Sequence, residues 1–177
     1  MNEAEKYFNS VQRDSWHWLD NSENLKISSE VIYKELHSLL EIFHNDRTFA
    51  DEEKIMALWS SYYLLVGLSF ENLVKGLSIE NNRSAKDFNE ILKKWGNNGH
   101  QISEIADKNI SILTDEERSI IKKLETYIVW AGRFHLPRKL KQFTDERGSL
   151  FYCSNDYDTI NKLYEKTKAL LELALEK

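Results

Sequence analysis

The sequence predicts an all-α protein: a single-domain antiparallel helical bundle with a long central helix at about residues 51–80 and additional short helices. Three observations lead to this fold class. Apolar residues recur at intervals of three and four over long stretches, which is the pattern of one helix face. One proline and six glycines in 177 residues leave few forced turns. No two alternating segments are joined by the turn residues that close a β-hairpin.

We expect one domain, residues 1–177, because the length suits one hydrophobic core and no repeat or linker divides it. Cys153 is the only cysteine, so no disulfide within the chain and no Cys-based zinc site is expected, which favours a reducing, cytoplasmic setting. The N-terminus lacks a signal-peptide pattern, and the most apolar stretch, residues 55–70, is short for a membrane span. The expected protein is therefore cytoplasmic, with no membrane partner and no cofactor.

The first two helices are predicted at about residues 3–18 and 29–45. Aromatic residues in the first suggest that it docks onto a core, and the second has the more regular apolar repeat. The residues of one face are Tyr7, Phe8, Val11, Ser15 and Trp18 in the first helix and Ile32, Leu36, Leu39, Leu40 and Phe43 in the second.

The central helix is predicted from its start signal and its length. Thr48 stands three residues before Asp51, and acidic residues fill the first turn, where they favour a helix N-terminus. Additional leucines widen the apolar stripe, as expected for a helix with neighbours on more than one side. The stripe consists of Ile55, Trp59, Tyr62, Val66, Phe70, Leu73 and Leu77.

Shorter helices should follow. Ser84 and Asp87 signal a helix that ends at Trp95, and another should cover residues 100–108. Thr114 and Glu117 form the clearest capping box of the chain, at the start of a helix with an apolar face from Ile120 to Ala131. We expect an extended loop at residues 132–154 and a last helix from Asn155.

The charge distribution and the absence of known motifs limit the classes of function that this chain can have. The formal net charge is −5, but residues 1–80 hold 14 acidic against 7 basic side chains, whereas residues 131–177 hold 7 against 9. A basic patch is therefore expected in the C-terminal third. Phosphate-binding glycine loops, HExxH and GxSxG are absent from the sequence, and no two histidines have the i, i+4 spacing of a helical metal site. We expect no metal site.

Three polar residues are given structural roles. Glu71 and Lys75 have the i, i+4 spacing of an ion pair, and apolar neighbours suggest that Glu71 is partly buried. A buried carboxylate needs a cation, for which Arg133 is the expected partner. His100 should donate to a nearby carbonyl or carboxylate. A direct functional role of Glu71 or His100 is the alternative.

The segment from Trp130 to Lys141 is the strongest candidate for binding. Arginine binds phosphate with forked hydrogen bonds, lysine adds charge, and Phe134 is suited to stacking on a base. The alternative is a solvated loop that ends a helix at Gly132. The candidate RNA- or partner-binding residues are Arg133, Arg138, Lys139 and Lys141.

Three blocks of the sequence resemble bacterial HEPN-like helical-bundle proteins. Members of that family carry a long helix reading like GLAIENLLKG, a GHDL turn and an AGRYP loop. The matching blocks here are YLLVGLSFENLVKGL at residues 63–77, GHQI at 99–102 and AGRFHLP at 131–137, in the same order. The resemblance covers about residues 60–137, and the rest of the chain matches only in being helical.

The resemblance implies an all-α bundle, often dimeric, in a superfamily tied to RNA processing, toxin–antitoxin systems and defence against phage. Active members cleave RNA without a metal, using an arginine and a histidine four to six residues apart. Arg13 and His17 have three residues between them, and Arg133 and His135 have one, so this chain departs from that pattern. Arg133 and His135 are the fallback catalytic pair. There the histidine would exchange a proton with the ribose and the arginine would stabilise charge on phosphate.

Three functions stay open. The first is a non-catalytic HEPN-like interaction protein, a homodimer that binds RNA or a partner protein in a defence or toxin–antitoxin type system. The second is a metal-independent ribonuclease with the altered Arg133 and His135 pair. The third is a dimeric structural module whose acidic N-terminal half contacts a basic protein.

Overall fold

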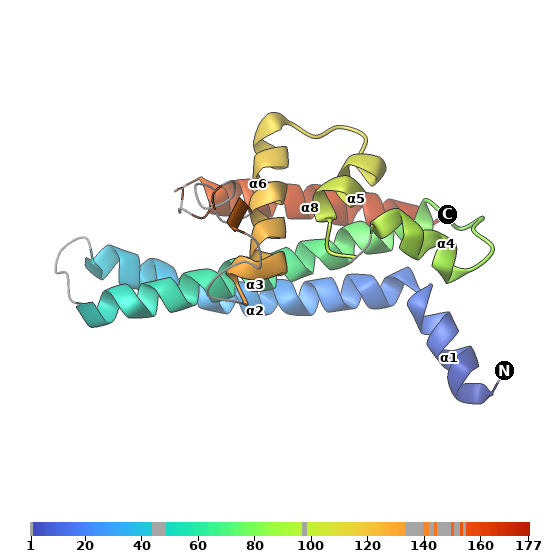
Figure 1. The fold of residues 1–177 in the computed structure, drawn as a ribbon, viewed down its shortest axis with the longest axis horizontal. Helices are drawn as coiled ribbons and strands as arrows, with labels where there is room; N and C mark the ends of the chain where they lie inside the picture. The colour runs from blue at the N-terminus through green and yellow to red at the C-terminus, as the bar shows by residue number, and fades with distance from the viewer. Residues whose placement is uncertain are drawn as a thin grey trace.

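The computed structural model of the protein describes residues 2–43, 49–96, 99–133, 140–141, 144, 150, 153 and 155–177. Regular structure in these residues is entirely helical, which confirms the predicted all-α bundle (Figure 1). The elements are α1 (Glu3–Gln12), α2 (Ser15–Phe43), α3 (Phe49–Glu80), α4 (Phe88–Leu92), η1 (Lys93–Trp95), α5 (Ile102–Asn109), α6 (Asp115–Thr126), η2 (Tyr127–Ala131) and α8 (Asp156–Leu175).

Two long antiparallel helices, α2 and α3, form the long axis of the molecule (Figure 1). Helix α8 packs along this pair, α6 crosses it, and α1 projects away from the body at the end of α2. Helix α3 packs against α2, α5, α6, η2 and α8. It is therefore the long central helix that the sequence predicts.

The division between the first two helices was predicted wrongly. A helix at 3–18 and a second from residue 29 were expected, whereas α1 ends at Gln12 and α2 begins at Ser15. The carboxylate of Asp14 accepts the backbone N–H of Trp16 at 3.0 Å, as an N-cap residue does, and this starts the new helix. The stretch 19–28, which lacks a regular apolar repeat, is helical because it packs on α3.

Serine side chains hold α2 close to α3. Ser22 Oγ donates to the carbonyl of Ser69 at 2.8 Å, and Ser69 Oγ donates to the carbonyl of Ser22 at 2.8 Å. Seven residues away on each helix, Ser15 Oγ donates to the carbonyl of Gly76 at 3.3 Å. Seven-residue steps from Ser22 and Ser69 in the other direction reach Ser29 and Leu36 on α2 and Tyr62 and Ile55 on α3. All four of these residues are buried. The pair thus repeats every heptad, like an antiparallel coiled coil.

The shorter helices begin largely where the sequence predicts. Asp87, rather than Ser84, caps α4 by accepting the N–H of Glu90 at 3.1 Å, and η1 ends at Trp95. Thr114 and Glu117 form the predicted capping box of α6, with reciprocal bonds of 3.1 and 2.8 Å. Helices α5 and α8 begin within two residues of their expected starts.

The loop expected at 132–154 lies mostly outside the described residues. Leu140, Lys141 and Thr144 are described and have helical conformation, so the expectation was wrong there. The Thr144 hydroxyl donates to the Lys141 carbonyl at 2.9 Å. The loop was inferred from mixed charge and Pro137, but leucine and lysine favour helices.

Candidate functional site

The basic segment singled out in the sequence follows η2. Arg133 comes directly after Gly132, the residue that caps η2, and its side chain is exposed. Lys141 is also exposed. Three other predicted site residues, His135, Arg138 and Lys139, lie outside the described residues. The structure therefore shows two cations of this segment on the surface, and places the first at the end of η2.

Arg133 emerges from a π-helical turn. The N–H of Gly132 donates to the carbonyl of Tyr127 at 3.0 Å, five residues earlier, which gives η2 its π geometry. Such turns are rare and are frequent at functional sites. A Cβ on Gly132 would lie 2.8 Å from Cβ of Leu64, so glycine lets the turn pack directly on α3. Two of the sequence blocks, residues 63–77 and 131–137, thus meet here.

Glu71, Lys75 and His100 form a second polar site, with Glu71 at its centre. Glu71 and Lys75 are buried on α3 and form an ion pair. His100 Nδ1 lies 3.1 Å from both carboxylate oxygens of Glu71. The His100 side chain is 37% exposed, so the site opens to solvent on that side. A carboxylate that holds one imidazole nitrogen sets the orientation of the ring, as in acid–base sites.

Aromatic rings enclose the ammonium group of this site. Lys75 Nζ lies 5.0 Å from the ring centre of Trp95 and 5.8 Å from that of Trp18, within range of cation–π attraction. Gly99 has φ +70°, a left-handed conformation suited to glycine, and the position of its missing Cβ is 3.8 Å from Lys75 Nζ. This turn places His100 over Glu71.

The partner of Glu71 differs from the expected one. Arg133 was expected to supply the cation, but the structure brings Lys75 and His100 to the carboxylate. Lysine at i+4 reaches Glu71 from the same helix, whereas Arg133 starts from the exposed end of η2.

A third polar site was missed in the sequence. Asp156, at the start of α8, accepts hydrogen bonds from Lys123 Nζ and Tyr63 Oη, both at 2.5 Å. All three residues are buried, and they join α6, α3 and α8. The ammonium group of Lys123 also lies 4.8 Å from the ring centre of Tyr63. This buried pair connects three helices in the interior.

Tyrosine hydroxyls around this third site are held in their neutral form. Burial and the hydrogen bond to Asp156 raise the pKa of Tyr63 far above its ordinary value. Burial raises the pKa of Tyr127 to about 12, although its oxygen accepts the indole N–H of Trp59 at 2.7 Å. Tyr127 in turn donates to the carbonyl of Leu150 at 3.1 Å. These side chains are suited to packing and anchoring rather than to proton transfer near neutral pH.

One sequence signal could have indicated this site. Lys123 stands on the apolar face of α6 between Ile120 and Tyr127, at helical spacing from both. A lysine on such a face is expected to bury its ammonium group only beside a carboxylate. The partner, Asp156, is 33 residues away, so the pairing itself depends on the fold.

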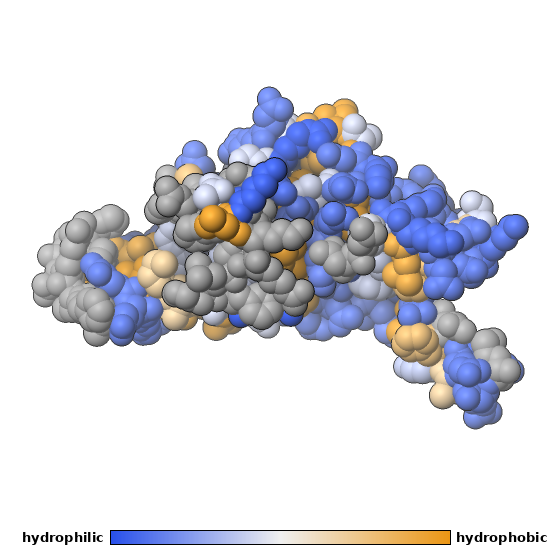
Figure 2. Space-filling model, viewed as in Figure 1, coloured by the Kyte–Doolittle hydropathy of each residue, from blue (hydrophilic) through white to orange (hydrophobic). Residues whose placement is uncertain are grey.

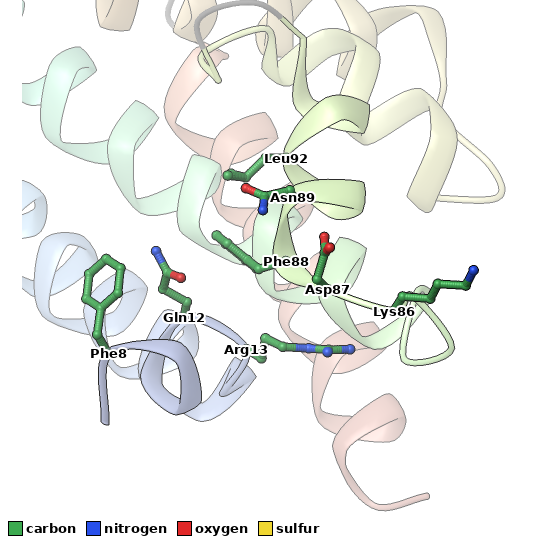
Figure 3. Close-up of a pocket in the computed structure, with 8 residues that line it drawn as sticks. All are labelled: Phe8, Gln12, Arg13, Lys86, Asp87, Phe88, Asn89 and Leu92. Carbon is green, nitrogen blue, oxygen red and sulfur yellow. The ribbon is translucent and has the colours of Figure 1, made fainter. Parts of the chain in front are cut away.

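A groove of about 470 Å³ lies between α1 and α4 (Figure 3). Phe8, Phe88 and Leu92 give it an apolar part, and polar side chains line the rest. Arg13 at its edge donates to the carbonyl of Ala85 at 3.0 Å and so ties the end of α1 to the chain before α4. The groove contains none of the predicted site residues, and it is open rather than enclosed.

No three His, Cys, Asp or Glu side chains in the described ranges are grouped so that they could hold a metal ion. Within the same ranges, no helix has the length and apolar character needed to span a membrane. Comparison of the chain with family models, curated proteins and solved structures finds no match.

Proposed function

We propose that this chain is a dimeric, non-catalytic HEPN-like interaction protein that binds RNA through the segment from Arg133 to Lys141. Its setting is the reducing cytoplasm, in a system of the defence or toxin–antitoxin type. Within the segment, Arg133, Arg138, Lys139 and Lys141 contact phosphates, to which arginine offers a fork of donors and lysine a point charge.

A contrast between buried and exposed cations supports this proposal. Lys75 and Lys123 are buried and paired with carboxylates, so both are committed to the fold. Arg133 and Lys141 are exposed and begin and end a segment rich in basic residues. Exposed cations that are close together in the chain can bind a phosphate backbone with little loss of hydration. Their binding releases the counterions of the backbone, which favours the complex.

The test is RNA binding measured over a range of salt concentrations. We expect the triple variant Arg138→Ala, Lys139→Ala, Lys141→Ala to weaken binding of a fluorescent single-stranded RNA. Loss of three phosphate contacts should reduce the slope of log K against log salt by about 2, at roughly 0.7 per contact. Fluorescence anisotropy gives both quantities.

The matched control removes the same charge elsewhere, by Lys6→Ala, Lys108→Ala and Lys177→Ala, all at exposed positions. This control should keep most of the affinity and most of the slope. An equal loss in both triple variants would mean that net charge, not the segment, drives binding. No binding by the unmodified protein would contradict the RNA proposal and favour a partner protein.

A metal-independent ribonuclease is the second candidate. It is favoured by the π-helical turn before Arg133, a geometry common at functional sites, and by the imidazole held on Glu71. Cleavage of RNA in EDTA by purified protein would support it. Loss of cleavage in His135→Ala would assign the reaction to the predicted pair, and loss in His100→Ala would assign it to the Glu71 site. Cleavage unchanged in both variants would point to another residue or a contaminant.

A further inference from the structure

Helix α2 exposes a stripe of large apolar side chains. Trp16, Ile27, Val31 and Ile42 are each between 55% and 65% exposed. Intervals of 11, 4 and 11 residues separate them, which at about 100° per residue keeps all four within about 80° of the helix circumference. We call these four residues the α2 stripe.

The fold of a single chain leaves the α2 stripe uncovered. Ser15, Ser22 and Leu36 face α3 from the opposite side of α2 and are buried there. Glu23 and Glu30 occupy a flank, where they accept hydrogen bonds from Lys168 and Tyr157 of α8. Ile27 and Val31 lie one turn apart, and Trp16 and Ile42 extend the same face by about three turns on either side, with polar positions between them. Exposed large apolar side chains that repeat along one helix face indicate a contact surface.

The spacing of the residues in the α2 stripe indicates which partner packs against it. The intervals read the same in both directions along α2, so an antiparallel copy of α2 would set Trp16 against the partner's Ile42 and Ile27 against the partner's Val31. Such self-complementarity is what a twofold interface requires. We propose that the α2 stripe is the homodimer interface of this protein, occupied by α2 of a second copy in antiparallel orientation. This inference rests on the dimeric part of the proposed function.

Charges on the same face agree with this orientation. Asp20 and Lys34 are exposed and lie within the angular range of the stripe. In the antiparallel alignment Asp20 is opposite the partner's Ser38, one helical turn from the partner's Lys34, and the twofold axis repeats the pair. A parallel alignment would place Asp20 against Asp20 and Lys34 against Lys34, which is unfavourable.

The direction in which α1 projects also agrees with a second copy packed on α2. Helix α1 leaves α2 beside Trp16 and projects from the side of the body away from α6 (Figure 1). Tyr7 and Phe8 on α1 are exposed, and Figure 2 shows apolar surface there. The antiparallel arrangement brings this end of one copy to the end of the partner's α2 at Ile42, which is also exposed. The arrangement thus gives a neighbour to the exposed end of α1 as well as to the α2 stripe.

Light scattering after size exclusion is the first measurement, and the unmodified protein should be a dimer. Ile27→Asp with Val31→Asp places charges in the interface and should raise the dimer dissociation constant at least about 100-fold. Ile112→Asp, at an exposed apolar position outside α2, should leave the dimer intact. Asp20→Lys and Lys34→Asp should each weaken the dimer singly, and restore it when combined.

Disulfide cross-linking tests the orientation in a Cys153→Ser background. Trp16 and Ile42 are about 39 Å apart along α2, so cysteines there cannot join within one chain. The double variant Trp16→Cys, Ile42→Cys should form covalent dimers on oxidation, whereas each single variant should not. A dimer that cross-links through the single variants, or through none, would overturn the antiparallel α2 interface. A monomer would overturn the dimeric part of the proposed function as well, and the RNA-binding assay tests the remaining part separately.

Discussion

Two buried ion pairs among the described residues of this protein differ in how they are assembled. Glu71 and Lys75 lie one turn apart on the same helix, and His100 closes their site at the surface. Lys123 and Asp156 come from different helices and meet a tyrosine of a third helix inside the bundle. The first pair forms with α3, whereas the second exists only when α3, α6 and α8 have docked. A local pair is therefore visible in the sequence, and a long-range pair is not.

The largest expected effect comes from breaking the long-range pair. Asp156→Asn removes the negative charge and leaves the Lys123 ammonium group buried without it, which should cost about 3–5 kcal/mol of unfolding free energy. Urea denaturation measures this loss. Asp158→Asn, an exposed change in the same first turn of α8, is the control and should cost less than about 1 kcal/mol. Equal losses would mean that Asp156 acts only on the helix terminus.

Breaking the local pair should cost less. Glu71→Gln should lower the unfolding free energy by about 2 kcal/mol, because Lys75 keeps the faces of Trp18 and Trp95 as neighbours. Glu104→Gln is the matched control, since Glu104 pairs with Lys108 at the same i, i+4 spacing on the surface. Its effect should be below about 0.5 kcal/mol. A greater loss from Glu71→Gln than from Asp156→Asn in urea denaturation would reverse the comparison.

Alkaline pH should lower the folding stability by ionising Tyr63 and Tyr127, the interior tyrosines of the long-range site. Their folded pKa values lie above the unfolded value of about 10, so the neutral hydroxyls add stability below pH 10. That contribution is lost as the pH rises from 10 through the folded value of Tyr127, about 12. The midpoint of urea denaturation should fall as the pH rises from 9 to 12. It should fall less steeply in the variant Tyr127→Phe than in the unmodified protein. Tyr7→Phe, at an exposed position, should keep the slope of the unmodified protein.

The smallest effect is expected at the exposed edge of the local site. His100→Asn should cost about 0.5 kcal/mol in urea denaturation, since Glu71 keeps Lys75 and the imidazole is partly solvated. His17→Asn is the control, because His17 Nδ1 makes a similar contact, 2.9 Å from the carboxylate of Asp14, at an exposed position. A loss above about 2 kcal/mol for His100→Asn would show that the imidazole, not Lys75, stabilises the buried carboxylate.

Sequence reasoning succeeded where the signal is local. The capping box of Thr114 and Glu117 involves four consecutive residues, and α3 carries its apolar stripe over its own length. It failed at the start of α2, where the heptad of Ser15, Ser22 and Ser29 is a packing pattern made of small polar residues. Serine favours caps and turns in isolation, so the repeat becomes meaningful only once α3 offers partners such as Ser69.

The candidate sites divide in the same way. The ion pair of Glu71 with Lys75 follows from spacing on one helix, but the place of His100 depends on the turn at Gly99. The role of Lys123 was invisible because its carboxylate comes from α8. The α2 stripe is readable as an interface only after the structure shows which face of α2 packs on α3.

The sequence by itself determined the all-α class, the central helix, the capped start of α6 and the run of basic residues that begins at Arg133. These depend on neighbours within a few turns, whose interactions are present in any helical conformation of the chain. Only the tertiary structure decided the helical conformation of residues 19–28, the burial of Lys123 with Asp156 and the outward face of α2. Each of these depends on contacts between residues distant in the chain, which become favourable only when folding brings their helices together.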